Sequence, residues 1–394
     1  MKILWVKADF LHPTSRGGQI RTLEMLKRLH LRHEVHYVGL DDGASAESVP
    51  RAKEYSSHVY PVAHRAPART SPEFWTQLAG NLFSPLPLSL ARYRSPEFRR
   101  TIEEVRRRES PDAMVCDFLT PAVNIDDLSG WVLFQHNVET MIWRRHAENA
   151  GDALRKQYFN AQAERMFRAE RDVCSRVRTV ITVSEADARM HREMFGVSRA
   201  PHVPTGVDVE WLAPTSPRTI ETDLVFVGSM DWMPNIDGVE YFLDEILPLI
   251  RRRRPACTVT IVGRRPPASL RTRSESDPNL RITGTVDDVR PYLWSAAASI
   301  VPLRVGGGTR LKIYESMAAR TPVVSTSIGA EGLGIHPPDD IRIADTSDAF
   351  AEACLDLLYD AGERARMAQA AADLVASNYS WERVTGDFER ILFD

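Results

Sequence analysis

The first half of the chain alternates short apolar runs, rich in β-branched residues, with longer amphipathic segments. The apolar runs predict strands at residues 2–7, 35–40, 113–117, 132–135 and 179–183. A Gly-containing loop and a helix over about residues 18–31 follow the first of these strands. Strands that alternate with helices in this way build a parallel sheet with helices on its faces.

The same alternation starts again near residue 223. Strands are predicted at residues 223–227, 258–262, 299–302 and 322–325, and each leads into a loop that contains glycine. A helical pattern through Val239, Phe242, Ile246 and Ile250 follows the first of them. In open α/β sheets ligands bind at the carboxyl ends of the strands, so these loops are candidate binding loops.

These two repeats predict an α/β protein with two Rossmann-like parallel-sheet domains. A chain of 394 residues is too long for one hydrophobic core, which also favours two domains. We place the domains at residues 1–205 and 221–378. The linker at 206–220 lies in a segment with four prolines that suits a hinge. Residues 379–394 predict a final helix with Trp381, Val384, Phe388 and Ile391 on one face, which we expect to pack back on the first domain.

Composition and charge exclude several classes of protein. Fifty basic and fifty-three acidic residues give a net charge of -3, so no overall field attracts nucleic acid. The four cysteines, Cys116, Cys174, Cys257 and Cys354, lie far apart, show no metal-ligand spacing and are expected to be reduced. The apolar run at residues 3–6 is too short for a signal peptide, and no run reaches the length of a spanning helix. We therefore predict a cytoplasmic protein, with peripheral membrane contact left open.

The segment VPLRVGGGTRLKIYESMAARTPVV predicts an anion site between a strand and a helix. Gly306, Gly307 and Gly308 allow backbone amides to approach an anion, and Thr309 can cap the helix that follows. The positive end of the helix dipole then favours a bound phosphate.

Three charged side chains at the start of this helix indicate which anion the site would bind. Arg310 and Lys312 face the positive end of the dipole, so a diphosphate would offset their charge; a solvated basic turn is the alternative. Glu315 lies about 9 Å along the helix axis from the cap, at roughly 1.5 Å per residue. A carboxylate there can accept hydrogen bonds from both hydroxyls of a ribose, or it can pair with Lys312.

Over nearly its whole length the chain resembles glycosyltransferase family 4, the retaining group with the GT-B fold. The motifs that carry the resemblance are SRGGQIRT, VPTGVD, FVGSMDWMPN, ITGTVDDVRPYL and GGGTRLKIYESMAARTPVV, in the family's order. The resemblance implies two domains that face each other across a cleft, an N-terminal one for the acceptor and a C-terminal one for the nucleotide sugar. It implies a retaining, metal-independent hexosyl transfer, most simply from a UDP- or GDP-linked sugar, with no cofactor. The acceptor would be a glycan, a lipid-linked or a small molecule, and bacterial surface polysaccharide synthesis is the implied setting.

The resemblance also assigns residues. Glu315 matches the second glutamate of the family's paired motif, which binds the donor ribose. Gly17 and Gly18 match the N-terminal glycine loop at the diphosphate, and Gly228 matches the glycine that opens the second domain. His136, in FQHN, lies where the family has a histidine near the transferred sugar. The backbone around Thr285 and Val286, after Gly284, corresponds to the stretch that reads the nucleobase.

Two departures from the family pattern stand out. Gly307 occupies the place of the first motif glutamate, so the donor sugar must be held by other groups. Ser229 follows Gly228 where many members have an arginine, and no lysine is nearby in sequence. Asn235 cannot supply that charge, so we predict that Arg310 and Lys312 bind the diphosphate instead.

Residues 70–110 combine apolar residues with a later run of arginines. Either this stretch docks on an anionic membrane that carries a lipid-linked acceptor, or it is helix packing with a solvated basic face. Two other functions remain open: a sugar-nucleotide epimerase of the same fold and a non-catalytic nucleotide-sugar-binding subunit. The chain has no GxGxxG turn for a dinucleotide and no Asp-x-Asp triplet for a metal.

Overall fold

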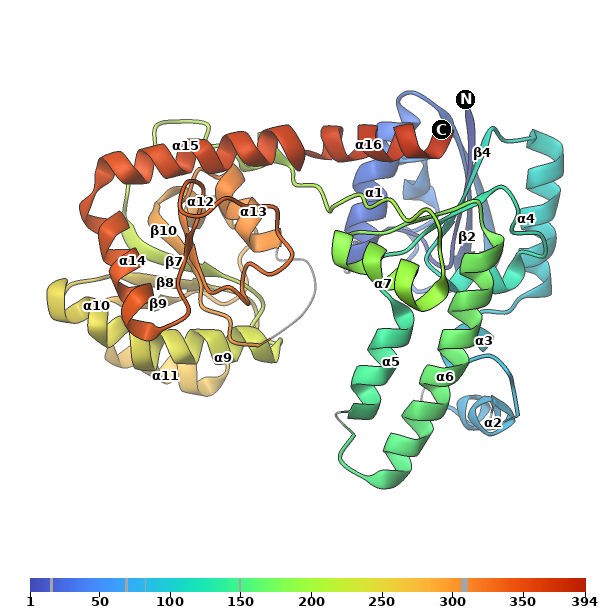
Figure 1. Cartoon of the computed structure of the whole chain (residues 1–394), viewed down its shortest axis with the longest axis horizontal. Coiled ribbons are helices and arrows are strands. Elements are labelled where there is room, and N and C mark those ends of the chain that lie inside the picture. The colour runs from blue at the N-terminus through green and yellow to red at the C-terminus, as the bar shows by residue number, and fades with distance from the viewer. Residues whose placement is uncertain (15–16, 68–69, 82, 149, 306–310) are drawn as a thin grey trace. The chain divides into compact units, whose positions relative to one another are not determined.

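The chain folds into two units, each built around its own parallel sheet (Figure 1). The computed structural model describes residues 1–14, 17–67, 70–81, 83–148, 150–305 and 311–394. The first unit contains Met1–Pro204 together with Val384–Asp394, and the second contains Thr205–Arg383.

The sheet of the first unit has six parallel strands in the order β3-β2-β1-β4-β5-β6. These strands are β1 (Lys2–Lys7), β2 (Glu34–Asp41), β3 (His58–Ala63), β4 (Ala113–Asp117), β5 (Trp131–Phe134) and β6 (Thr179–Ile181). The helices are α1 (Gly17–His30), η1 (Pro50–Glu54), α2 (Pro72–Asn81), α3 (Leu88–Ala91), α4 (Pro96–Glu109), η2 (Thr120–Asn124), α5 (Glu139–Glu148), α6 (Ala153–Arg176) and α7 (Glu185–Phe195).

The sheet of the second unit also has six parallel strands, in the order β12-β11-β10-β7-β8-β9. These are β7 (Thr222–Val227), β8 (Val259–Val262), β9 (Leu280–Ile282), β10 (Ala296–Val301), β11 (Val323–Ser325) and β12 (Arg342–Ile343). The helices are α8 (Val209–Leu212), α9 (Met233–Tyr241), η3 (Phe242–Ile246), α10 (Leu247–Arg253), α11 (Ala268–Ser276), α12 (Arg290–Trp294), α13 (Leu311–Ala318), α14 (Ser347–Tyr359), α15 (Ala361–Asn378) and the start of α16 (Trp381–Phe393).

Three strands were not anticipated from the sequence: β3, β9 and β12. β3 forms one edge of its sheet, most of its residues are not buried, and it contains Pro61, so it lacks a continuous apolar run. β9 and β12 have three and two residues, and Leu280 is the one buried residue among them, so neither is an apolar run. The other nine strands lie within a few residues of their predicted positions.

The end of α16 completes the core of the first unit. The Phe388 ring packs against Trp5 and Phe134, with centroid distances of 5.6 and 5.0 Å. Arg178 of the first unit donates a hydrogen bond to the Leu392 carbonyl at 2.6 Å. Leu392 is buried in this helix, whereas Ile391, expected on the inner face, is only partly buried.

Candidate functional site

In each sheet the strand order reverses at one point, and the candidate site residues gather there. In the first sheet the reversal lies between β1 and β4, whose last residues Lys7 and Asp117 are partners in the sheet register. In the second sheet it lies between β7 and β10. Such switch points at the carboxyl edge are where open α/β sheets bind ligands.

The carboxylate of Asp117 is the centre of a buried polar network. It accepts hydrogen bonds from Trp5 Nε1 at 3.0 Å, Thr22 Oγ1 at 2.7 Å and His136 Nε2 at 2.8 Å. Lys7 Nζ pairs with it at 3.0 Å, and both of these side chains are buried. Burial raises the pKa of Asp117, but the charge of Lys7 and the contact with His136 outweigh it and hold this pKa well below its usual range.

The network fixes the tautomer of His136, which follows β5. An ionised carboxylate can only accept, so His136 carries its proton on Nε2 and has a lone pair on Nδ1. Burial lowers the pKa of His136 to about 4, although Asp117 acts in the opposite direction, so the ring is neutral at pH 7. Nδ1 is buried, and within the described residues it has no hydrogen-bond partner.

The free nitrogen of His136 faces the start of α1. A Cβ added to Gly18 would lie 3.7 Å from His136 Nδ1 and only 2.7 Å from the Phe118 ring. The rings of His136 and Phe118 stack, with centroids 3.9 Å apart. Glycine at position 18 therefore keeps the backbone close to both rings, whereas a Cβ at Gly17 would meet no neighbouring atom within 4 Å.

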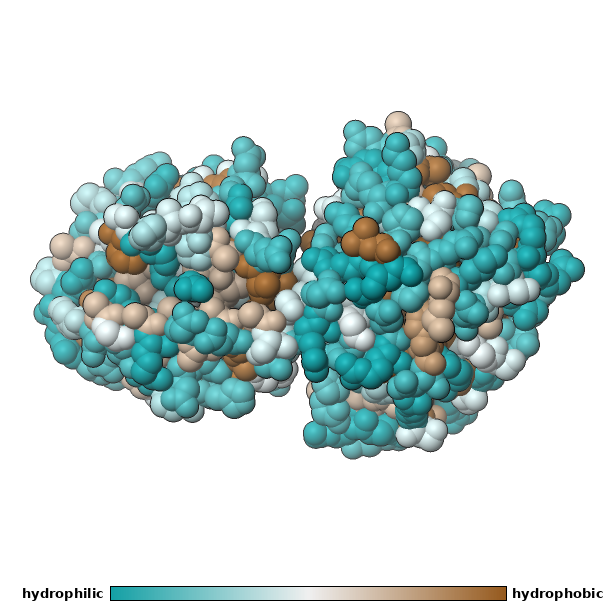
Figure 2. Space-filling model, turned by 90° about the horizontal axis from the view of Figure 1, so that it is seen from above, coloured by the Kyte–Doolittle hydropathy of each residue, from teal (hydrophilic) through white to brown (hydrophobic). Residues whose placement is uncertain are grey.

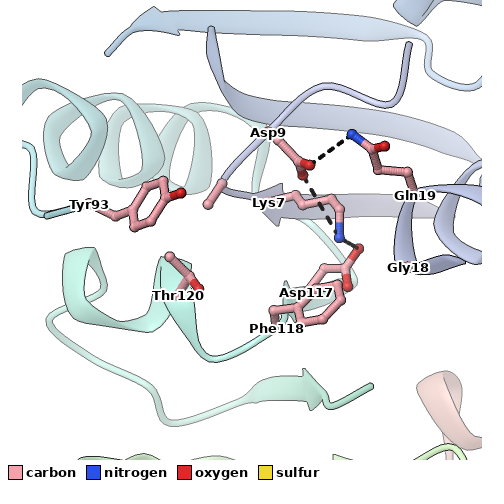
Figure 3. Close-up of a pocket in the computed structure, with 9 residues that line it drawn as sticks. Lys7, Asp9, Gly18, Gln19, Tyr93, Asp117, Phe118 and Thr120 are labelled. Carbon is pink, nitrogen blue, oxygen red and sulfur yellow. Dashed lines mark hydrogen bonds and ion pairs between the residues drawn. The ribbon is translucent and has the colours of Figure 1, made fainter. Parts of the chain in front are cut away.

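A cavity of about 230 Å³ opens beside this network (Figure 3). It is lined by Lys7, Ala8, Asp9, Gly18, Gln19, Tyr93, Asp117, Phe118 and Thr120. Lys7 Nζ lies 4.1 Å from the centre of the Phe118 ring and has no hydrogen-bond partner within the described residues, although it pairs with Asp117. Sequence reasoning did not identify Lys7 or Asp117. The sequence feature that could have identified each of them is a charged residue at the end of an otherwise apolar strand.

A second, more polar cavity of about 550 Å³ adjoins the first and shares Ala8, Asp9, Gln19 and Tyr93 with it. Its walls include the polar residues Asp41, Asp42, Ser45, His64, Arg65 and Arg92. Asp41 ends β2, Asp42 and Ser45 follow that strand, and His64 and Arg65 follow β3. Arg92 comes directly after α3. The first unit thus offers a continuous cavity rich in hydrogen-bonding groups at the carboxyl edge of its sheet.

In the second unit Lys312 reaches the loop after β7. Its Nζ donates to Asn235 Oδ1 at 2.7 Å and lies 4.4 Å from the centre of the Phe226 ring. A Cβ added to Gly228 would approach this ammonium group to 2.7 Å. The sequence has no lysine near Gly228, but the fold brings Lys312 there. Asn235 carries no charge itself and instead positions the ammonium group of Lys312.

Arginine side chains from the next strand reach the same loop. Arg264 follows β8 and donates to Ser229 Oγ at 2.8 Å, and it pairs with Asp231 at 3.3 Å. The backbone there is tightly packed, because a Cβ on Gly263 would lie 1.9 Å from the Gly228 carbonyl oxygen. Sequence reasoning missed Arg264, since only the pairing of β7 with β8 shows which loops are neighbours.

The remaining predicted donor residues lie along the same edge or outside the described residues. Glu315 is half-buried on α13; burial raises its pKa and the charge of Lys312 lowers it. Thr285 is exposed after β9, and Val286 is half-buried against the core. The five predicted residues Gly306, Gly307, Gly308, Thr309 and Arg310 lie outside the described residues.

The structure separates the apolar and basic parts of residues 70–110. The exposed aromatic residues are Trp75 on α2 and Phe83 just after it, with 60% and 93% of their surface accessible. The arginines belong to α4, which packs on the first sheet. Four of them form ion pairs: Arg106 and Arg107 with Glu103, Arg108 with Glu109, and Arg99 with Asp126. The α4 part therefore fits the second of the two interpretations, helix packing with a paired polar face, and membrane contact of residues 70–110 stays a prediction.

Two parallel sheets of this topology, each with its own switch point, form the GT-B fold. In the Anabaena protein HepE, solved in complex with UDP-glucose, the same fold recurs over 100% of this chain and 99% of that one. The TM-score is 0.61 and the sequence identity 13%.

Residues 221–360, within the second unit, match the family model described as glycosyl transferases group 1. The chain is accordingly a glycosyltransferase whose second unit matches the group 1 model, while membership of glycosyltransferase family 4 stays a prediction. A curated relative from Klebsiella pneumoniae, described as an uncharacterized 44.6 kDa protein in the cps region, is 20% identical over 97% of both chains. A GDP-mannose-dependent monoacylated α-(1-6)-phosphatidylinositol monomannoside mannosyltransferase from Corynebacterium glutamicum is 24% identical over 54% of this chain and 61% of its own length.

Proposed function

We propose that this glycosyltransferase transfers a sugar from a nucleoside diphosphate sugar with retention of the anomeric configuration and without a metal ion. The observation that carries the proposal is the ammonium group of Lys312, held by Asn235 against Gly228 at the switch point of the second sheet. A fixed cation beside a glycine loop suits a diphosphate, because the charge and the backbone amides can both bind it.

The second unit would bind the nucleotide part of the donor. Lys312 binds the diphosphate, with Arg264 beside it and Arg310 as a further predicted contact. Glu315 accepts the ribose hydroxyls. The backbone around Thr285 reads the base. UDP- and GDP-linked sugars are the donors to test first, since HepE was solved with UDP-glucose and the Corynebacterium relative depends on GDP-mannose.

Transfer breaks the bond between the anomeric carbon and the diphosphate oxygen, and the acceptor oxygen forms the new bond on the same face of the sugar. The leaving diphosphate gains negative charge as this bond breaks, and cations that are already in position stabilise that charge without rearranging. The acceptor hydroxyl gives its proton to the departing diphosphate oxygen in the same reaction.

His136 would hold the donor sugar. Its Nδ1 lone pair accepts a hydrogen bond from a sugar hydroxyl, because Asp117 keeps the proton on Nε2. With its pKa lowered to about 4 by burial, His136 is a weak base at neutral pH. We therefore assign it sugar binding near the reacting carbon and not general-base catalysis.

The polar cavity of the first unit would take the acceptor. Its carboxylates, hydroxyls and arginines match the hydroxyl groups of a carbohydrate, so we propose a glycan, or the sugar end of a lipid-linked acceptor, as the partner in polysaccharide synthesis.

Peripheral membrane contact, if the acceptor is lipid-linked, would involve α2 with Trp75 and Phe83, and not the arginines of α4. The face seen in Figure 2 is mostly hydrophilic with small, separated apolar patches. None of the helices in the described parts of the chain combines the length and apolar character needed to cross a membrane.

We place the enzyme in the cytoplasm, where its four buried thiols stay reduced.

A donor screen tests this proposal. Purified protein in EDTA is titrated with UDP-, GDP- and TDP-sugars by calorimetry, and nucleotide release is followed with and without candidate glycan acceptors. One donor should bind and release its nucleotide, and Glu315→Ala should weaken that binding by at least about tenfold, the equivalent of one hydrogen bond to a charged group. Glu331→Ala, at an exposed glutamate of the same unit, is the matched control and should bind as the wild type does.

The products separate the alternatives. NMR of the glycoside should show the anomeric configuration of the donor. A changed sugar nucleotide without an acceptor would indicate an epimerase, and tight donor binding with no turnover would indicate a non-catalytic subunit. Absence of binding by every donor would refute the proposed donor site.

A further inference from the structure

Two histidines and a glutamate meet at the amino edge of the first sheet, opposite the carboxyl edge that carries the cavities. Glu34 is the first residue of β2 and His58 the first residue of β3, and His36 is the register partner of His58. Glu34 Oε1 lies 3.0 Å from His36 Nε2 and 3.2 Å from His58 Nε2. One ligand atom from each of the three residues lies within 4.8 Å of the other two.

The two separations from Glu34 match those of a tetrahedral metal site, and the two histidine nitrogens lie within 4.8 Å of each other. Ligand atoms bound to Zn²⁺ at about 2.0–2.1 Å are roughly 3.3 Å apart along each edge of the tetrahedron. Two imidazole nitrogens and one carboxylate oxygen are also a known ligand set for this ion, with the fourth position open to water. His58 and Glu34 are partly exposed, with 52% and 41% of their side-chain surface accessible, so the open position can face solvent.

The surrounding side chains orient His36 as a metal ligand requires. His36 is buried, its ring stacks on that of His58 with centroids 4.6 Å apart, and its Nδ1 lies 3.1 Å from the Tyr60 hydroxyl. With Nδ1–H donating to Tyr60, the Nε2 lone pair points at the cluster, which is the second-shell arrangement of bound histidines. Arg108 donates to the same Tyr60 hydroxyl at 3.0 Å and fixes that oxygen.

We propose that Glu34, His36 and His58 bind a divalent transition-metal ion of the zinc class, with water as the fourth ligand. The site joins the edge strand β3 to β2. It lies roughly 20 Å from the carboxyl edge of β2, at about 3.3 Å per residue along the strand, so it stabilises the sheet and takes no part in sugar transfer. The alternative is a metal-free cluster in which the two imidazoles donate to Glu34.

Cobalt distinguishes these two states. Protein without an affinity tag is treated with chelator, dialysed and titrated with Co²⁺. One equivalent should produce the visible absorption of tetrahedral Co²⁺, one equivalent of Zn²⁺ should abolish it, and Zn²⁺ should raise the melting temperature. His58→Ala and Glu34→Gln should each lose the stoichiometric absorption.

The matched control is His202→Ala. His202 is a partly exposed histidine that pairs with the single carboxylate of Glu185 at 3.2 Å, in the same unit, and its loss should leave Co²⁺ binding unchanged. Tyr60→Phe should weaken Zn²⁺ binding by about 10- to 100-fold, the usual effect of removing a second-shell partner. Circular dichroism confirms that each variant is folded, which is expected because Glu34 and His58 are partly exposed.

Absence of tetrahedral Co²⁺ absorption in the wild type would overturn the proposal. So would retention of that absorption in folded His58→Ala. The readouts for this site are metal binding and melting temperature. A negative result for the metal site therefore does not change the interpretation of the donor screen, and a negative donor screen does not change the interpretation of the metal titration.

Discussion

Both units hold polar groups at the switch point of their sheet, but the burial of these groups differs between the two units. In the first unit Lys7, Asp117 and His136 are buried, and Lys7 and His136 both pair with the Asp117 carboxylate. In the second unit Lys312 is only partly buried and Arg264 is exposed, with 58% of its side-chain surface accessible. Stability depends strongly on the pairing of buried charges, whereas charges nearer the surface contribute less to it. We expect damage to the first site to affect stability and damage to the second to affect binding.

Removing the carboxylate of Asp117 should have the largest effect. Asp117→Asn removes the buried negative partner of Lys7 and leaves this ammonium group with the partly exposed Asp9 at 4.0 Å, so the first unit should lose about 3–5 kcal/mol of unfolding free energy in urea titrations. The control is Asp172→Asn, which breaks an exposed pair with Arg176 in the same unit and should cost at most about 1 kcal/mol. Equal losses in the two variants would remove the distinction between the units.

The pH dependence of stability gives a second test of the buried site in the first unit. The unfolded His136 takes up a proton near pH 6.5, but the folded ring stays neutral until the pH reaches about 4. The unfolded state therefore binds more protons in this window, and stability falls as the pH decreases from 6.5 to 4. This difference corresponds to roughly 3 kcal/mol.

The measurement is urea unfolding of the wild type and of His136→Gln at several pH values in that window. The variant should lose less stability than the wild type on acidification. His202→Gln, at a partly exposed histidine, should follow the wild type. A parallel decline in all three proteins would mean that His136 is protonated in the folded state.

Lys312 should affect donor binding more than stability. Lys312→Met removes a charged hydrogen-bond donor worth about 1.5–3 kcal/mol, so donor affinity in calorimetry should fall by about 10- to 150-fold. Asn235→Ala should weaken binding less, because the cation remains but loses its anchor. Arg252→Met, at an exposed arginine of the same unit, is the control. Unchanged donor affinity in Lys312→Met would contradict the proposed diphosphate contact.

Arg264 should give the smallest effect. Arg264→Ala should weaken donor binding by at most about tenfold and change stability by less than about 0.5 kcal/mol, as for other exposed substitutions. Its contribution should decrease at high salt, since exposed charges are screened. Arg265→Ala is the matched control, because Arg265 pairs with the same Asp231 and is even more exposed.

The sequence predicted the two sheets because nine of the twelve strands in the described residues lie in short, largely buried apolar runs. It also singled out Lys312 and Glu315, since the strand, the glycines and the helix that place them are consecutive. The group 1 resemblance and the GT-B fold are confirmed. The roles of the individual site residues stay predictions.

What the sequence could not supply is the pairing of residues on different strands. Lys7 meets Asp117 only because β1 pairs with β4 in one register, and His36 meets His58 only because β2 pairs with β3. β3 itself was missed, so the cluster at its first residue could not be foreseen. In the same way, Arg264 reaches Ser229 through the neighbouring β7 and β8.

The position of α16 has a consequence for synthesis on the ribosome. Phe388 packs on Trp5 and Phe134, yet the entire second unit is translated between these aromatic residues. At about 5–20 residues per second, this takes on the order of ten seconds or more. During that interval the nascent first unit lacks one wall of its aromatic core, so it needs protection from aggregation until the last helix emerges.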